Sequence, residues 1–183
     1  MIYVTRHGQT DWNVRKKVMG KCNEPLNDDG IKQAQATRDK IAGTRIDLII
    51  SSPLLRAQQT AEIINEALGA PIIYDDRISE RDFGEFEGME QKEFDFGGYW
   101  NYYKNNHYQQ AENIQDFFTR VYTFLDDIAQ KYPNKNVMLV AHGGVSIPVN
   151  CYFNKNIPEG SLVDAGLVLA NCEVKSYDNA NEV

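Results

Sequence analysis

Short apolar segments alternate along this chain with segments of helical periodicity, and this alternation constrains the fold more than any other feature. Residues 2–5, 46–50, 72–74 and 137–141 are β-prone or apolar runs of the kind that form buried strands. Apolar side chains at helical spacing fall between and after these runs, most regularly over 114–132. The alternation predicts an α/β fold: a three-layer sandwich in which helices cover both faces of a mostly parallel central sheet.

Capping signals predict the boundaries of the first two helices. Asn27 is a favourable N-cap for a helix over 28–42. Ser52 followed by Pro53 predicts that the second helix begins there, since serine is a good N-cap and proline a good first helical residue. Gly69 predicts the end of that helix, because glycine readily adopts the left-handed conformation that closes a helix.

The remaining segments carry weaker patterns. A helix is expected over 143–151. Residues 167–170 and 173–177 are expected to form a final strand that is interrupted by a bulge. The polar segments 6–27 and 75–98 are expected to be loops.

The composition is that of an ordinary globular protein. A chain of 183 residues without repeats predicts a single domain over 1–183. The net charge of −7 argues against a nucleic-acid partner, because such proteins usually carry a basic face. No apolar run is long enough to cross a membrane, and the first residues do not resemble a secretory signal. Cys22, Cys151 and Cys172 are widely spaced, which predicts reduced thiols and a cytoplasmic location.

Basic side chains follow three of the predicted strands. Arg6 and His7 follow the first strand, Arg56 lies shortly after the second, and His142 follows the fourth. Ligands of open parallel sheets bind beyond the carboxyl ends of the strands. Arg56 falls in the first turn of its helix, where a cation is disfavoured by about 0.3–1 kcal/mol. Its presence there, together with Arg6, favours an anion bound at the helix N-terminus.

The chemistry of these side chains suits a phosphate group. Two arginines, two histidines and an asparagine supply hydrogen-bond donors and positive potential for phosphoryl oxygens. A neutral imidazole is a competent nucleophile near pH 7, and a carboxylic acid with a raised pKa can protonate a leaving oxygen. The residues alone leave the choice of acid open among Glu80, Asp82, Glu85 and Glu87.

Five sequence blocks add a family resemblance. Residues 6–13, RHGQTDWN, resemble the signature of the histidine phosphatase superfamily, the phosphoglycerate mutase-like proteins. The blocks at 26–34, 51–61, 78–88 and 140–144 are similar to further stretches of the same family, in the same order. The resemblance implies a phosphoglycerate mutase-like fold, a small-molecule phosphate ester as substrate, and neither a metal nor an organic cofactor.

The resemblance also implies a role for each matching residue. It makes His7 the nucleophile that becomes phosphorylated and Glu80 the proton donor, which later activates water, with Asp82 as the second choice. The residues that it assigns to the phosphoryl oxygens are Arg6, Arg56 and His142, with further hydrogen bonds from Asn13 and the amide of Gly143, and with Thr10 lining the pocket.

The segment between the acid loop and the second histidine bears on the choice between hydrolysis and mutase chemistry. In the family it is a variable cap, here about 85–112, and family mutases that use a bisphosphate carry an insertion and extra basic residues there. In this chain the segment is short, acidic and aromatic, and only Lys92, Lys104 and His107 could meet a second phosphate. An acidic cap repels a bisphosphate, so we expect a phosphatase that hydrolyses monophosphate esters.

Three other interpretations remain at this point. Tyr99, Trp100, Tyr102 and Tyr103 are typical of packing, but their place in the cap also fits contact with the non-phosphate part of a substrate. Two histidines with carboxylates could bind a divalent metal, although Arg6 beside His7 opposes a cation. The chain could also be a non-catalytic phosphate-binding protein.

Two further assignments concern residues outside the expected phosphate pocket. Glu85 and Glu87 are expected to be solvated or structural rather than catalytic. Arg120, within the predicted helix 114–132, is expected to be an ordinary surface or packing residue.

Overall fold

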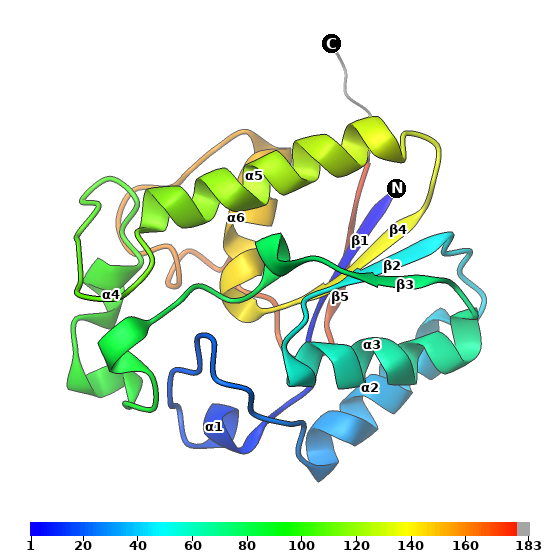
Figure 1. Ribbon diagram of the computed structural model, residues 1–183, viewed down its shortest axis with the longest axis horizontal. Coiled ribbons are helices and arrows are strands. Elements are labelled where there is room, and N and C mark those ends of the chain that lie inside the picture. Colours follow the sequence, from blue (N-terminus) through cyan, green and yellow to red (C-terminus); the bar gives the residue numbers. More distant parts are fainter. Residues whose placement is uncertain (179–183) are drawn as a thin grey trace.

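The computed structural model describes residues 1–178 and contains one five-stranded sheet (Figure 1). Its strands are β1 (Ile2–Arg6), β2 (Leu48–Ser51), β3 (Ile72–Tyr74), β4 (Val137–Ala141) and β5 (Val174–Tyr177). They lie in the order β3-β2-β4-β1-β5; the first four are parallel, and β5 pairs antiparallel with β1. The predicted, mostly parallel sheet is therefore confirmed.

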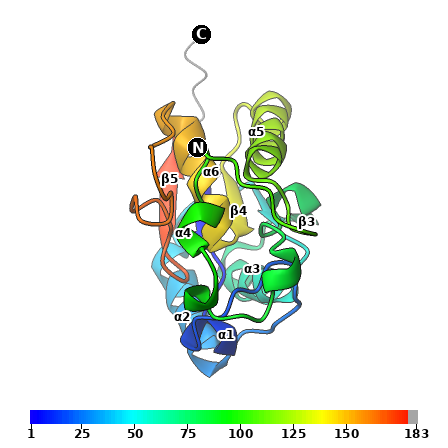
Figure 2. The same cartoon turned by 90° about the vertical axis from the view of Figure 1, so that its left-hand side faces the viewer.

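Helices cover both faces of this sheet (Figures 1 and 2). The helices are α1 (Asp11–Val14), α2 (Asp28–Ile41), α3 (Leu55–Leu68), α4 (Phe96–Tyr99), α5 (Ile114–Lys131) and α6 (Gly143–Asn154). Alternate residues of the central strands face two separate cores. Val137 and Leu139 belong to the core beneath α5 and α6, whereas Met138 and Val140 pack against α3. This alternation confirms the three-layer sandwich.

The capping predictions hold at two helix ends and fail at a third. The Asn27 side chain accepts a hydrogen bond from the amide of Gly30 and caps α2, and Gly69 ends α3 in the left-handed conformation. The prediction that Ser52 caps the second helix is wrong, because α3 begins at Leu55 with Leu54 as its N-cap. The Ser52 hydroxyl instead bonds the ring of His142.

The final strand is also shorter than predicted. Residues 174–177 form β5, but residues 167–170 are not a strand. That segment instead crosses the end of β1, where Arg6 Nη1 donates to the Leu169 carbonyl oxygen at 3.0 Å. The last five residues of the predicted domain, 179–183, lie outside the described residues.

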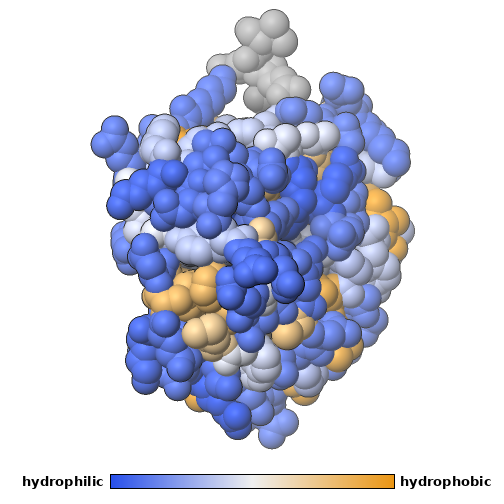
Figure 3. All heavy atoms as spheres, turned by 60° about the vertical axis from the view of Figure 1, so that its left-hand side comes forward, coloured by the Kyte–Doolittle hydropathy of each residue, from blue (hydrophilic) through white to orange (hydrophobic). Residues whose placement is uncertain are grey.

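The segment from 75 to 113 contains little regular structure, as predicted for its first part. It holds only the short helix α4 and three single 3-10 turns, Asp76–Ile78, Gly84–Phe86 and Gln91–Glu93. Figure 3 views the molecule from the side of this segment and shows a mostly hydrophilic surface with a few hydrophobic patches. None of the helices within residues 1–178 combines the length and apolar character needed to cross a membrane.

Candidate active site

The two histidines and Arg56 meet at the carboxyl edge of the sheet. His7 follows the last residue of β1, His142 follows the last residue of β4, and Arg56 is the second residue of α3. The centroids of the two imidazole rings are 5.2 Å apart. Arg56 Nε donates to His7 Nε2 at 3.3 Å. The convergence arises because β1, β2 and β4 are parallel neighbours, so their ends lie at one edge.

His7 is held as a neutral imidazole with a defined tautomer. Its Nδ1 lies 2.7 Å from the carbonyl oxygen of Gly8, which can only accept, so Nδ1 carries the proton. Burial, together with the nearby charges of Arg56 and Arg6, holds the pKa of His7 well below its usual range. Nε2 is therefore unprotonated near neutral pH and accepts the hydrogen bond from Arg56.

His142 is similarly buried but has a different hydrogen-bond partner. Its Nε2 is 2.8 Å from the Ser52 hydroxyl. Burial and the charge of Arg56 hold its pKa well below the usual range. Within residues 1–178, its Nδ1 is a buried polar atom without a hydrogen-bond partner, as is Nε of Arg6. Such orphaned groups are rare, and both atoms are free to bond a polar ligand at this edge of the sheet.

Arg56 is fully buried, and the chain of residues 20–22 holds its guanidinium group. Nη1 donates to the Cys22 carbonyl oxygen at 2.7 Å and Nη2 to that of Gly20 at 2.9 Å. Burial lowers its pKa to about 10, which still leaves it charged near pH 7. Its charge has no carboxylate within salt-bridge distance among the described residues, so it remains available to an anion.

Glu80 lies at the same edge and is fixed by backbone amides. Its Oε2 accepts from the amide of Gly144 at 3.0 Å and its Oε1 from the amide of Arg81 at 2.9 Å. A Cβ on Gly144 would lie 2.1 Å from Glu80 Oε1 and 2.6 Å from Cη2 of Trp100. Only glycine therefore allows the carboxylate to approach the start of α6.

A cavity of about 360 Å³ opens beside these groups. Its polar lining includes Arg6, Asn13 and Glu80, and its apolar wall includes Phe83 and Trp100. The other lining residues are Lys17, Val18, Met19, Gly20, Gln91, Phe96, Gly143, Gly144, Val163, Asp164 and Val168.

The nucleophile candidate lies behind this lining rather than in it. His7 and His142 are each 1% exposed and Arg56 is 0% exposed, and each adjoins a lining residue: Arg6, Gly143 and Gly20 respectively. A phosphoryl group in the cavity would therefore reach His7 only if the contact between Arg56 and His7 opened.

Of the other predicted site residues, two line the cavity and two do not. Gly143 and Asn13 line the cavity. Thr10 is fully buried and caps α1, and its hydroxyl contacts Met19 rather than the cavity. Asp82 is also absent from the lining, and its carboxylate accepts from the amide of Gly84 at 2.8 Å.

The aromatic segment is mainly part of the core. Tyr99 is 1% exposed, and Tyr102 packs against Phe118. Of the four predicted aromatic contacts, only Trp100 lines the cavity. The predicted cations Lys92, Lys104 and His107 are exposed and do not line it.

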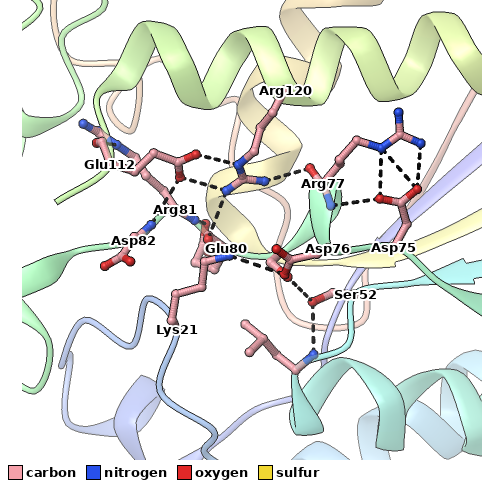
Figure 4. Close-up of polar contacts among 12 residues, drawn as sticks. Lys21, Ser52, Asp75, Asp76, Arg77, Glu80, Arg81, Asp82, Glu112 and Arg120 are labelled. Carbon is pink, nitrogen blue, oxygen red and sulfur yellow. Dashed lines mark hydrogen bonds and ion pairs between the residues drawn. The ribbon is translucent and has the colours of Figure 1, made fainter. Parts of the chain in front are cut away.

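Sequence reasoning missed several residues around the acid loop. Ser52 contacts His142, and the fully buried Arg81 stacks on Tyr99, with its guanidinium carbon 3.6 Å from the ring centroid. Arg120 and Glu112 bond the loop that carries Glu80 (Figure 4). The only signal for these residues was their type, because the partners are far apart in the sequence.

The sheet brings two neighbouring imidazoles and two orphaned polar atoms together beyond its strand ends, where open α/β folds bind their ligands. A family model described as the histidine phosphatase superfamily, branch 1, matches residues 2–181. The chain therefore belongs to the histidine phosphatase superfamily.

Individual relatives carry phosphatase and mutase names. The chain is 42% identical over 142 residues to the uncharacterized phosphatase PhoE of Bacillus subtilis (strain 168), covering 78% of this chain and 71% of that protein. It is 30% identical over 186 residues to the probable phosphoglycerate mutase GpmB of Proteus mirabilis (strain HI4320), covering 98% and 85%. These names support an enzyme of phosphate-ester hydrolysis or transfer.

Solved structures share the fold. Bacillus stearothermophilus YhfR superposes with a TM-score of 0.85 at 26% identity, covering 94% of this chain and 88% of that one. A mycobacterial glucosyl-3-phosphoglycerate phosphatase in complex with VO3 gives a TM-score of 0.83 at 24% identity, covering 94% and 88%. At that identity the second likeness concerns the fold alone. The expected phosphoglycerate mutase-like fold is confirmed.

Proposed function

We propose that this protein is a phosphomonoesterase that hydrolyses a small phosphorylated metabolite through a phosphohistidine on His7. The observation that carries the proposal is the neutral His7 imidazole, protonated at Nδ1, bonded by Arg56 and close to Arg6 and the His142 ring. The orphaned Arg6 Nε and His142 Nδ1 support a phosphoryl group beside it. Asn13 and the amide of Gly143, at the cavity wall, would add hydrogen bonds.

The first step transfers the phosphoryl group to the enzyme. The hydrogen bond from Arg56 Nε to His7 Nε2 breaks, and Arg56 Nε donates to a phosphoryl oxygen instead. The lone pair of His7 Nε2 is then free. His7 Nε2 then attacks phosphorus, and the bond to the ester oxygen breaks in line with it. Glu80 in its protonated form gives its proton to that oxygen, so an alcohol leaves. The fixed guanidinium groups stabilise the charge on the equatorial oxygens.

The second step returns the enzyme to its starting state. Glu80, now a carboxylate, removes a proton from a water molecule, and the water oxygen attacks phosphorus. The bond between phosphorus and Nε2 breaks, and inorganic phosphate leaves. Glu80 regains the proton that it lost.

Hydrolysis is favoured over mutase chemistry by the charge of the cavity. The cations in its lining are Arg6, already committed to the phosphoryl group, and Lys17. Asp164 offsets Lys17, so a second phosphate would meet little positive charge. Because some relatives are named as probable phosphoglycerate mutases, mutase activity is the second candidate function. An assay of phosphoglycerate interconversion, run beside the phosphatase assay, distinguishes the two functions.

The proposal extends to organisation and location. Residues 1–183 would act as a single domain, with 85–112 as the cap over the cavity. The free thiols of Cys22, Cys151 and Cys172 support a reducing, cytoplasmic location.

Replacing Glu80 by glutamine should slow the enzyme in a way that depends on the leaving group. Glutamine keeps the shape but cannot donate the proton, so kcat for an alkyl phosphate should fall about 10²- to 10³-fold. An aryl phosphate with an activated leaving group needs little protonation and should lose far less in the phosphorylation step. Equal losses in that step for both esters would remove Glu80 from the proton-donor role.

Hydrolysis should be independent of divalent metals. A cation beside His7 would meet the positive charges of Arg6 and Arg56. We expect the rate to be unchanged after dialysis against EDTA, measured before and after addition of magnesium, manganese or zinc. Loss of activity that one metal restores would replace the phosphohistidine mechanism by a metal-assisted one.

A further inference from the structure

Arg120 of α5 makes four hydrogen bonds beside the loop that carries Glu80 (Figure 4). Its Nη1 donates to the Arg77 carbonyl oxygen at 2.7 Å, and its Nη2 donates to the Glu80 carbonyl oxygen at 3.2 Å. Its Nε and Nη2 also bind the two carboxylate oxygens of Glu112, at 2.6 Å and 2.8 Å. One planar group therefore joins both sides of the acid loop.

Glu112 continues the same connection into the cap. Its Oε2 accepts from the amide of Asp82 at 3.3 Å, and its own amide donates to the Asp82 carbonyl oxygen at 3.0 Å. Its carbonyl oxygen accepts from Arg81 Nε at 3.0 Å. Residues 80–82 and 112, which flank the cap in the sequence, are thus bonded to each other. Arg120 bonds both Glu80 and Glu112.

The ion pair of Arg120 and Glu112 is largely shielded from solvent, which favours one fixed arrangement of the two side chains. The side chains of Arg120 and Glu112 are 20% and 18% exposed, and the guanidinium carbon is 4.7 Å from the ring centroid of Phe117. A bidentate, largely buried pair differs from an exposed ion pair, whose contribution to stability is small.

We propose that Arg120, acting with Glu112, is a positioning residue for proton transfer by Glu80. This inference rests on the proposed function. The Glu80 carboxylate reaches Gly144 only when its own backbone is in place, and Arg120 bonds that backbone directly. The phosphate-binding groups come from other elements, β1, α3 and α6, and Arg120 bonds none of them. Its loss should therefore affect proton transfer and spare anion binding.

A double-mutant cycle with two esters tests the proposal. Arg120→Gln should lower kcat for an alkyl phosphate about 10- to 100-fold, because a displacement near 1 Å costs about 10²-fold. It should change the phosphorylation rate with an activated aryl phosphate less than about threefold and leave the affinity for inorganic vanadate unchanged. In the Glu80→Gln background it should cause no further loss, since it acts through Glu80.

Two further variants serve as a replacement and as a control. Arg120→Lys keeps the charge but loses the bidentate fork, so it should fall between the wild type and Arg120→Gln. It replaces Arg120→Gln in the cycle if that variant does not fold, as judged by circular dichroism. Asp127→Asn removes an ion pair between the same helix and Arg77, without touching residues 80–82, and should leave both rates unchanged.

The outcomes distinguish failure of the proposed phosphatase function from failure of the positioning role of Arg120. A wild type without activity on either ester rejects the proposed function and this inference with it. An active wild type in which Arg120→Gln slows both esters equally, or adds its full loss to that of Glu80→Gln, rejects the positioning role alone.

Discussion

Replacing His7 by alanine should abolish phosphatase activity, with a fall in kcat of about 10⁴-fold or more, as for other removed nucleophiles. The imidazole is the only group that the mechanism uses to accept the phosphoryl group. The measurement is turnover of an aryl phosphate, alongside a circular dichroism spectrum that verifies folding.

The third histidine provides the matched control. His107 is exposed, and its ring contacts the Asn113 side chain rather than the cavity. His107→Ala should therefore keep the activity of the wild type. Substantial turnover by a folded His7→Ala protein would exclude the phosphohistidine route.

Replacing Arg56 by alanine should also have a large effect on activity. The guanidinium group is charged, buried and next to His7, so in the proposed mechanism it stabilises the phosphoryl oxygens. We expect kcat/KM to fall about 10²- to 10³-fold and the affinity for vanadate to fall in parallel.

The structural role of Arg56 has to be separated from this effect. The alanine variant also loses the bonds to Gly20 and Cys22, so its unfolding temperature should fall. Arg38→Ala, which removes a partly exposed arginine of α2, is the control for loss of a positive charge. Unchanged vanadate affinity in a folded Arg56→Ala protein would show that this side chain does not bind the phosphoryl group.

The central sheet and the strand ends could be predicted from the sequence because their signals are local. Apolar runs identify β2 and β4, and the residues after a parallel strand necessarily lie at its carboxyl edge. His7 and His142 could thus be placed together before the structure was known. The five blocks also predicted the family correctly.

Predictions failed where a side chain has a distant partner. Ser52 has the residue type of an N-cap, but its hydroxyl bonds His142, ninety positions away in the sequence. Arg120 has the pattern of a helix-surface residue, yet its guanidinium group binds backbone about forty residues earlier. Local propensity contains no information on such contacts, which depend on how α5 packs above the acid loop.

The formation of phosphohistidine on His7 is the central claim, and trapping that intermediate tests it most directly. The enzyme is mixed with an aryl phosphate and quenched in base within one turnover, because the bond between nitrogen and phosphorus is labile in acid. Peptide mass spectrometry should then find one added phosphoryl group on the peptide that contains His7, and none in His7→Ala. Rapid turnover without this adduct, or an adduct on a different residue, would contradict the account.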